Sequence, residues 1–187
     1  MTKIFAISIL FSSGILMCQQ INAQEKQTHE EPEEESNYPK HAISIELGHA
    51  HLSEGIRNGE SQWISVPSWA INYIYMINHE WAMGLHTDIL IEEFEVKSAG
   101  REDPVIKRSF PVSLVAAGSY KPLHYLSVVL GGGFEYTPEE TFAVIRFGVE
   151  PNIELSEKWE MVFSMMYDIK IDAYNSWNMG IGVARIF

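Results

Sequence analysis

From His41 onward, large apolar residues alternate with small or polar residues along the chain, segment after segment. Between Trp159 and Ile171 the odd positions carry large apolar side chains, while the even positions include Glu160 and Asp168. The sequence of this part shows no apolar stripe with the 3.6-residue period of an amphipathic helix. The pattern predicts an all-β fold whose strands have one apolar face and one polar face.

Eight segments show this alternation, and each has the 9–11 residues that a tilted membrane-spanning strand needs. They are 41–52, 62–77, 81–95, 105–120, 125–137, 141–155, 159–171 and 175–187. Their connections alternate in length. The tight ones are 78–80, 121–124 and 156–158, and the longer ones include 53–61 and 96–104. An even number of strands with such connections predicts an antiparallel up-and-down meander.

Side-chain size indicates which medium the apolar face meets. A soluble barrel would have to pack Trp, Tyr, Phe, Leu and Ile from nearly every strand into the narrow lumen of eight strands. Facing these side chains to lipid removes that problem, and backbone groups in lipid are satisfied only if the sheet closes. We therefore predict a closed eight-stranded antiparallel transmembrane β-barrel. A soluble ligand-carrying barrel with its apolar face inward is the alternative.

Aromatic residues gather towards both ends of the predicted strands, as expected for girdles at the two membrane interfaces. The group at the tight-turn end is Tyr73, Tyr75, Trp81, Tyr120, Tyr125, Trp159 and Phe187. The group towards the other end is Trp63, Phe94, Phe110, Tyr136, Phe142, Tyr167, Tyr174 and Trp177.

The N-terminal region predicts export. Residues 1–23 have a basic start, a short apolar stretch and a small residue before Gln24, which is typical of a secretory signal peptide. A membrane anchor and a lipoprotein acylated at Cys18 are the alternatives. Residues 24–40 are rich in glutamate and predict an acidic disordered tether. The formal net charge of −12 argues against a nucleic-acid partner.

The predicted signal, the eight alternating segments, the tight turns at one end and the C-terminal Phe187 resemble the small bacterial outer-membrane β-barrels of the OmpA-like and OmpX-like type. The resemblance covers about 41–187. It implies residence in the bacterial outer membrane, contact with its lipids, both ends of the barrel chain in the periplasm and the longer loops outside. It also implies that the last strand, ending in Phe187, is the insertion signal read by the barrel-insertion machinery. Arg185 departs from the apolar pattern on the outward face.

The opposite parity predicts a polar network inside the lumen. Its members are Glu46, His86, Asp88, Glu92, Glu135, Arg146, Glu150, Asp168 and Lys170. Since buried charges must be paired, we interpret the network as a plug that fills the lumen. A narrow cation-leaning channel is the alternative, because the acids outnumber the bases.

The tight turns also predict the register of neighbouring strands. Pairing Leu155 with Trp159 places Arg146 opposite Asp168, which predicts an ion pair in the lumen. Pairing Ile77 with Trp81 across 78–80 places Asn72 opposite His86 and Ala70 opposite Asp88. A further turn at Pro138 and Glu139 places Gly131 opposite Arg146.

Motifs for catalysis are weak. His51 and Ser53 share one strand face and resemble a fragment of the lipid A deacylase arrangement, but no orienting acid is assigned. His86 with Asp88 and Glu92, or His49 with His51, gives only a weak metal-site pattern. We predict no enzyme activity, no cofactor and no metal. The predicted role is structural or an interaction with an extracellular partner through loops 53–61 and 96–104, and a lipid-modifying enzyme is a further alternative.

Overall fold

The computed structural model describes residues 38–57, 59–97 and 105–187. The predicted signal peptide at 1–23 and nearly all of the predicted tether at 24–40 lie outside the described residues, as does most of the connection 96–104.

Within the described ranges, no helix has the length and apolar character that crossing a membrane requires.

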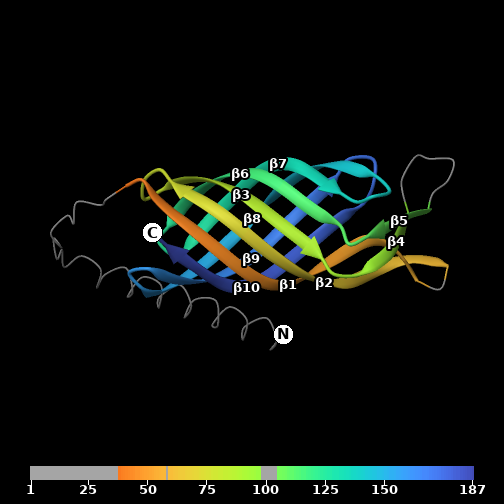
Figure 1. Cartoon of the computed structure of the whole chain (residues 1–187), viewed down its shortest axis with the longest axis horizontal. Coiled ribbons are helices and arrows are strands. Elements are labelled where there is room, and N and C mark those ends of the chain that lie inside the picture. The colour runs from red at the N-terminus through yellow and green to blue at the C-terminus, as the bar shows by residue number, and fades with distance from the viewer. Residues whose placement is uncertain (1–37, 58, 98–104) are drawn as a thin grey trace, which may run out of the picture. The chain divides into compact units, whose positions relative to one another are not determined.

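In the described part of the chain, ten strands form one sheet in which every neighbouring pair is antiparallel. They are β1 (Lys40–Arg57), β2 (Glu60–Met76), β3 (Trp81–Leu90), β4 (Glu93–Lys97), β5 (Val105–Ser109), β6 (Val112–Leu123), β7 (Leu126–Tyr136), β8 (Thr141–Ser156), β9 (Trp159–Lys170) and β10 (Asn175–Ile186). The barrel closes where β10 pairs with β1 (Figure 1). β3 and β4 together correspond to one predicted strand, 81–95, and β5 and β6 together correspond to another, 105–120. Counted in this way the ten strands are the eight predicted ones, and the predicted closed eight-stranded barrel is confirmed.

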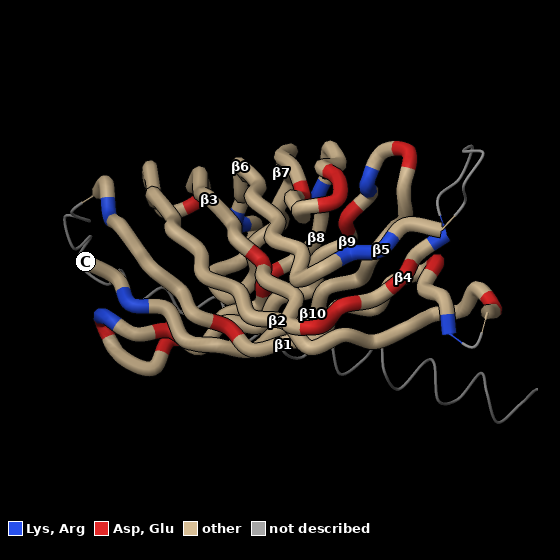
Figure 2. Tube along the Cα trace, turned by 45° about the vertical axis from the view of Figure 1, so that its right-hand side comes forward, with Lys and Arg blue, Asp and Glu red and all other residues tan. Residues whose placement is uncertain are grey.

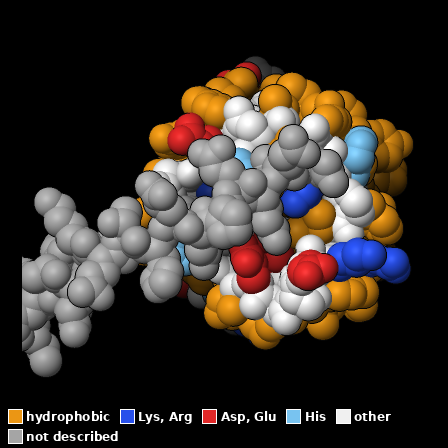
Figure 3. All heavy atoms as spheres, turned by 90° about the vertical axis from the view of Figure 1, so that its left-hand side faces the viewer, with side chains coloured by type: hydrophobic (Ala, Val, Ile, Leu, Met, Phe, Trp, Pro, Cys, Tyr) orange, Lys and Arg blue, Asp and Glu red, His pale blue; other side chains and the backbone are white. Residues whose placement is uncertain are grey.

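The large apolar side chains point away from the barrel axis and the charged ones point towards it. Trp159 on β9 is 43% exposed, whereas Arg146 and Asp168 are each 1% exposed. The turn end of the barrel, where β1 starts and β10 ends, shows apolar side chains around its rim and polar ones near its centre (Figure 3). The predicted parity is therefore confirmed, and the outer surface presents to its surroundings the apolar belt of a transmembrane barrel.

Two of the eight predicted strands are interrupted. The segment 81–95 breaks at Ile91 and Glu92, and the segment 105–120 breaks at Phe110 and Pro111. Pro111 has no amide hydrogen to continue the ladder, and Phe110 has a positive φ of 48°. The two breaks lie beside each other, because the Leu90 amide donates to the Pro111 carbonyl at 2.9 Å.

The breaks turn the β4–β5 hairpin across the far mouth of the barrel, which we call the hairpin end. Val96 on β4 pairs with Gly55 on β1, so the hairpin passes beyond β2, the neighbour of β3, and reaches β1. Its apolar side chains join a buried cluster with β1, β2, β3 and the β9–β10 turn: Ala50, Leu52, Val66, Leu90, Phe94, Val96 and Tyr174. This cluster, which we call the apolar cap, covers the lumen at the hairpin end.

The prediction that 53–61 is a loop is wrong, because β1 extends to Arg57 and β2 begins at Glu60, so the two strands form a hairpin there. Gly55 pairs with Gln62 and Arg57 pairs with Glu60, after a bulge beyond Leu52. Backbone pairing joins the two strands of this extension, so it stands at the hairpin end as a ribbon (Figure 1).

Three aromatic residues assigned to the outer girdle are in fact inside. Phe94, Phe142 and Tyr174 are buried, and Phe94 packs edge-to-face on Tyr174 with ring centroids 6.1 Å apart. Phe142 lies at an inward position by the parity of β8, Tyr174 lies in the β9–β10 turn as part of the apolar cap, and Phe94 enters the apolar cap with β4. By contrast, Trp63, Phe110 and Tyr136 are exposed, as predicted.

Candidate functional site

Arg146 is the centre of the polar lumen. Its Nε and Nη2 atoms donate to Oδ1 and Oδ2 of Asp168, both at 2.7 Å, which is the two-pronged geometry of strong arginine–carboxylate pairs. Its Nη1 atom lies 2.6 Å from Oδ2 of Asp88 on β3, and β3 is not a neighbour of β8 in the sheet. Arg146 therefore bridges the lumen from wall to wall.

A second polar cluster joins the lumen to the apolar cap. Arg108 on β5 donates from Nη2 to Oε1 of Glu135 at 2.6 Å, and Tyr174 donates its hydroxyl to the same oxygen at 2.6 Å. Nζ of Lys170 donates to Oγ of Ser176 at 2.6 Å and lies 3.5 Å from Oε2 of Glu135. The bond from Arg108 to Glu135 fixes the β4–β5 hairpin to β7, and both side chains are wholly buried.

Glu46 on β1 also points into the lumen, and it forms no ion pair with a basic side chain among the described residues. Its Oε1 accepts hydrogen bonds from Ser44 and Asn72, and its Oε2 accepts one from Ser164 at 2.6 Å. A glycine at position 182 makes room for it, since a Cβ there would lie 2.6 Å from Cγ of Glu46. A cavity of about 20 Å³ remains between Glu46 and Asp88.

The predicted lumen network is largely assembled. Glu46, His86, Asp88, Glu135, Arg146, Glu150, Asp168 and Lys170 are all buried. Glu92 is the exception, because it lies exposed in the bend between β3 and β4. The prediction also missed Arg108 and Glu160, which are buried inside. Parity places Glu160 inward, but the inward turn of Arg108 follows from the break at Phe110 and Pro111.

The predicted register is confirmed at the lumen and wrong at one turn. Arg146 faces Asp168 and Gly131, and β2 aligns with β3 as predicted at Asn72–His86 and Ala70–Asp88. At the β8–β9 turn, however, Trp159 pairs with Ser156 rather than with Leu155. A bulge between Glu154 and Ser156 absorbs the extra residue, so the register beyond it is unchanged.

His51 and Ser53, the residues of the weak catalytic pattern, do not form a catalytic triad in the described part of the chain. The hydroxyl of Ser53 accepts a hydrogen bond from the Asn175 amide at 3.1 Å. No bond joins Ser53 to His51 among the contacts of the described residues. Likewise, residues 38–57, 59–97 and 105–187 contain no group of three His, Cys, Asp or Glu side chains arranged to hold a metal.

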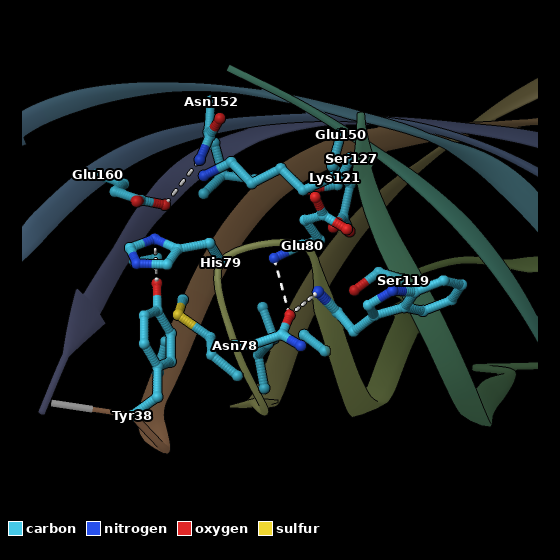
Figure 4. A pocket seen from close by; sticks show the side chains of 17 residues that line it. Tyr38, Asn78, His79, Glu80, Ser119, Lys121, Ser127, Glu150, Asn152 and Glu160 are labelled. Carbon is cyan, nitrogen blue, oxygen red and sulfur yellow. Dashed lines mark hydrogen bonds between the residues drawn. The ribbon is translucent and has the colours of Figure 1, made fainter. Parts of the chain in front are cut away.

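The turn end contains the larger cavity, about 80 Å³ in volume (Figure 4). Tyr38, which precedes β1, lies against His79 with ring centroids 4.6 Å apart and its hydroxyl 3.3 Å from Nδ1. Partial burial, together with the carboxylates of Glu160 and Glu154, raises the pKa of Tyr38 above its ordinary value. Two carboxylates, those of Glu160 and Glu154, therefore act on Tyr38 at the cavity mouth.

The hairpin end carries exposed charges on its ribbons and turns (Figure 2). Lys107 on β5 pairs with Glu93 on β4, with Nζ and Oε2 2.8 Å apart. Oε1 of Glu139, in the β7–β8 turn, accepts from the Ser109 hydroxyl at 2.6 Å, and this bond is the main reason that its pKa falls to about 2. Among the described residues, the exposed or half-buried acids there are Glu54, Glu60, Glu92, Glu93, Glu95, Glu139, Glu140 and Asp172, and the bases are Arg57, Lys97 and Lys107.

No protein-family model and no curated protein matches the chain. Solved structures do. Ail, the attachment invasion locus protein of Yersinia pestis, was solved in complex with the heparin analogue sucrose octasulfate. It is similar with a TM-score of 0.53 and 17% identity, over 80% of this chain and 99% of Ail. The outer membrane protein OprG from Pseudomonas aeruginosa is similar with a TM-score of 0.52 and 13% identity, over 80% of this chain and 97% of OprG.

This chain has the fold of the small outer-membrane β-barrels. The outer membrane protein AlkL, solved in lipid bilayers, shares it with a TM-score of 0.50 and 10% identity, over 80% of this chain and 90% of AlkL. At these identities the likeness is one of fold. Function has to be argued from the lumen, the apolar cap and the two ends of this barrel.

Proposed function

We propose that the protein resides in the bacterial outer membrane, with the turn end facing the periplasm and the hairpin end facing outside. The apolar belt of the barrel supports membrane residence, and the signal peptide predicted at 1–23 supports export. The last strand, with Phe187 after it, fits the insertion signal that the barrel-insertion machinery reads. In this orientation the two long ribbons, β1–β2 and β4–β5, stand outside the cell.

We propose further that the barrel is non-enzymatic and that its lumen is closed to solutes. The observation that carries this is the bridge from Asp88 through Arg146 to Asp168, which spans the lumen below the apolar cap. An ion would have to break paired, buried charges and then pass a layer of packed apolar side chains. Both steps are costly, so the charged plug fits better than the cation-leaning channel.

Conductance of the purified barrel in planar bilayers tests the closed lumen. We expect the wild type to insert without conducting steps. The double variant Phe94→Ala/Arg146→Ala removes one element of the cap and the bridge, so we expect it to conduct. Heat-modifiable gel mobility checks that both proteins are folded barrels. Steady cation-selective conductance of the wild type, abolished or changed by Arg146→Ala alone, would instead establish the channel.

The hairpin end supports a surface-interaction role with a basic, extended partner. The outer part of β2 pairs only with β1 among the described strands, because β3 pairs with β2 only as far as Ser68. The Pro67 carbonyl accepts from Ile91, so a period of two places the N–H and C=O groups of Ser65, Trp63 and Ser61 along the open edge. An open edge is suited to the addition of a strand from a partner, and the nearby carboxylates favour positive charge.

A binding assay with barrels in nanodiscs tests the charge of the partner. We expect an oligolysine peptide to bind with an affinity that falls as salt rises. The variant Glu93→Gln/Glu95→Gln/Glu139→Gln should weaken this binding, while Glu157→Gln at the turn end serves as the control. Sucrose octasulfate, the ligand in the Ail structure, should not bind, because acids predominate at this end. Binding of the sulfated ligand in preference to oligolysine would contradict the proposed partner chemistry.

A further inference from the structure

The cavity at the turn end combines apolar walls with buried carboxylates. Its walls include Ala42, Ile74, Ala82, Val162 and Ala184, which come from β1, β2, β3, β9 and β10. Figure 4 shows the Asn152–Glu160 pair on one side of the cavity and Glu150 and Ser127 on the other, with the Lys121 side chain extending between the two sides and Tyr38 and His79 along the mouth. This cavity is separate from the apolar cap and from the open edge of β2, which lie at the hairpin end.

The carboxylates of this cavity lack cationic partners. Glu150 is only 8% exposed and lines the cavity, and its Oε1 lies 3.7 Å from Nδ1 of His86, beyond hydrogen-bond distance. Glu160 accepts a hydrogen bond from Nδ2 of Asn152 at 2.9 Å, and no Lys or Arg of the described chain forms an ion pair with it. Buried carboxylates without a partner are costly, so an external donor of positive charge would stabilise this end of the lumen.

The unsatisfied groups favour a nitrogen donor. Oδ1 of Asn152 is buried and has no hydrogen-bond partner, while its Nδ2 is already used by Glu160. An ammonium group has three donors and no acceptor, so it can satisfy several oxygens of this kind at once. The apolar walls, by contrast, offer nothing to a hydrated metal ion and favour an alkyl body.

Two groups within the chain are poor occupants of the site. Lys121 lines the cavity, but its ammonium group forms no ion pair within 4.0 Å of Glu150 or Glu160 in the described structure. The sequence 24–37 that precedes Tyr38 contains six glutamates, so its charge opposes entry. Glu80 and Glu160 outnumber Lys121 among the charged side chains that line the cavity, which leaves the cavity negative.

We propose that the turn-end cavity binds a small primary ammonium carried on a short apolar chain. The ammonium group lies between the carboxylates of Glu150 and Glu160, and the alkyl chain lies against Val162 and Ala184. In the proposed orientation the ligand enters from the periplasm. The proposal does not depend on a closed lumen, since conductance is governed at the hairpin end and in the middle of the barrel.

Methyl NMR of the full barrel in nanodiscs, titrated with n-butylammonium, tests this site. We expect saturable shifts at the methyl groups of Ala42, Val162 and Ala184. n-Butanol and butyrate, which have similar size but no positive charge, should bind at least about tenfold more weakly, as expected for the loss of charge-assisted hydrogen bonds. No saturable shift with n-butylammonium, or equal affinity for n-butanol, would overturn the proposal.

Matched variants locate the charge that matters. Glu150→Gln/Glu160→Gln should lower the affinity for n-butylammonium about tenfold or more, whereas Glu95→Gln at the hairpin end should leave it unchanged. If the double variant fails the heat-modifiable mobility check, Lys121→Gln gives the converse test. Removing this like charge should tighten binding by about a few-fold. Unchanged affinity in a folded double variant, or in Lys121→Gln, would overturn the assignment to these residues.

Discussion

Arg146 on β8 and Asp168 on β9 face each other across neighbouring strands and are joined by two hydrogen bonds of 2.7 Å. Arg146 also reaches Asp88, so removing its side chain leaves the buried Asp88 without a cationic partner and leaves the buried Asp168 with only Asn178 and the more distant Lys170. We expect Arg146→Ala to lower the free energy of unfolding by about 3–5 kcal/mol. Urea unfolding followed by gel mobility measures this. Arg185→Ala, which removes an exposed arginine, should cost far less, and equal losses would contradict the bridge.

Tyr174 donates its hydroxyl to Glu135, a carboxylate that Arg108 also binds. Tyr174→Phe removes one charge-assisted hydrogen bond and keeps the ring in the apolar cap. We therefore expect a loss of about 1.5–3 kcal/mol in the free energy of unfolding. The control is Tyr125→Phe, because Tyr125 is exposed at the turn end. A stability change as small as that of the control would show that the Glu135 cluster does not hold the hairpin.

The β4–β5 hairpin is held by the apolar cap and by Arg108, so it should open more readily when the cap is weakened. Phe94→Ala leaves a gap beside Tyr174 and Leu52. We expect faster hydrogen exchange of the β4 and β5 amides, while the amides of β7 and β8 keep their protection. Exchange that rises equally in all four strands would mean that the hairpin is not a separate unit.

Because alternate residues face lipid, the free-energy cost of placing a charge on the outer face should depend on its depth in the membrane. Leu130 lies outward in the middle of β7, and Leu123 lies outward at the turn end of β6. Leu130→Lys should cost about 2–4 kcal/mol, whereas Leu123→Lys should cost about 0–1 kcal/mol because its charge reaches the headgroups. Unfolding in lipid vesicles measures both. Equal and small costs would place Leu130 outside the hydrocarbon layer.

The contact between Ser109 and Glu139 gives a pH prediction. Because the pKa of Glu139 falls from 4.5 to about 2, its contribution to stability is fully present above the ordinary value and is lost as pH falls through about 2. A carbon-13 NMR titration of the Glu139 carboxyl reports this pKa directly. In Ser109→Ala the pKa should rise towards 4.5, and an unchanged pKa would assign the shift to another cause.

The lumen shows how far local pattern predicts this barrel. Strict alternation predicts which residues of β8 and β9 face inward, and counting from the tight turns predicts that Arg146 meets Asp168. The count succeeded although the β8–β9 turn contains a bulge, because the pairing beyond the bulge is fixed by which face must meet lipid. Glu160 was missed although its parity is that of Asp168.

The β4–β5 hairpin shows where local pattern fails. The break at Phe110 and Pro111 changes the inward parity, so Arg108 points inside and Lys107 points out. Glu92 falls in the matching bend and is exposed. A tight bend of this kind depends on contacts with β1 and the β9–β10 turn, which are distant in sequence.

The sequence by itself determined the eight-stranded closed barrel, its inward and outward faces and its central ion pair, because the two-residue period and the demands of lipid act on every strand locally. Only the tertiary structure decided that one hairpin crosses the mouth and that a cavity with unpaired carboxylates remains at the turn end. Both features arise from the packing of side chains that meet only after the sheet has closed, and no short stretch of sequence contains that information.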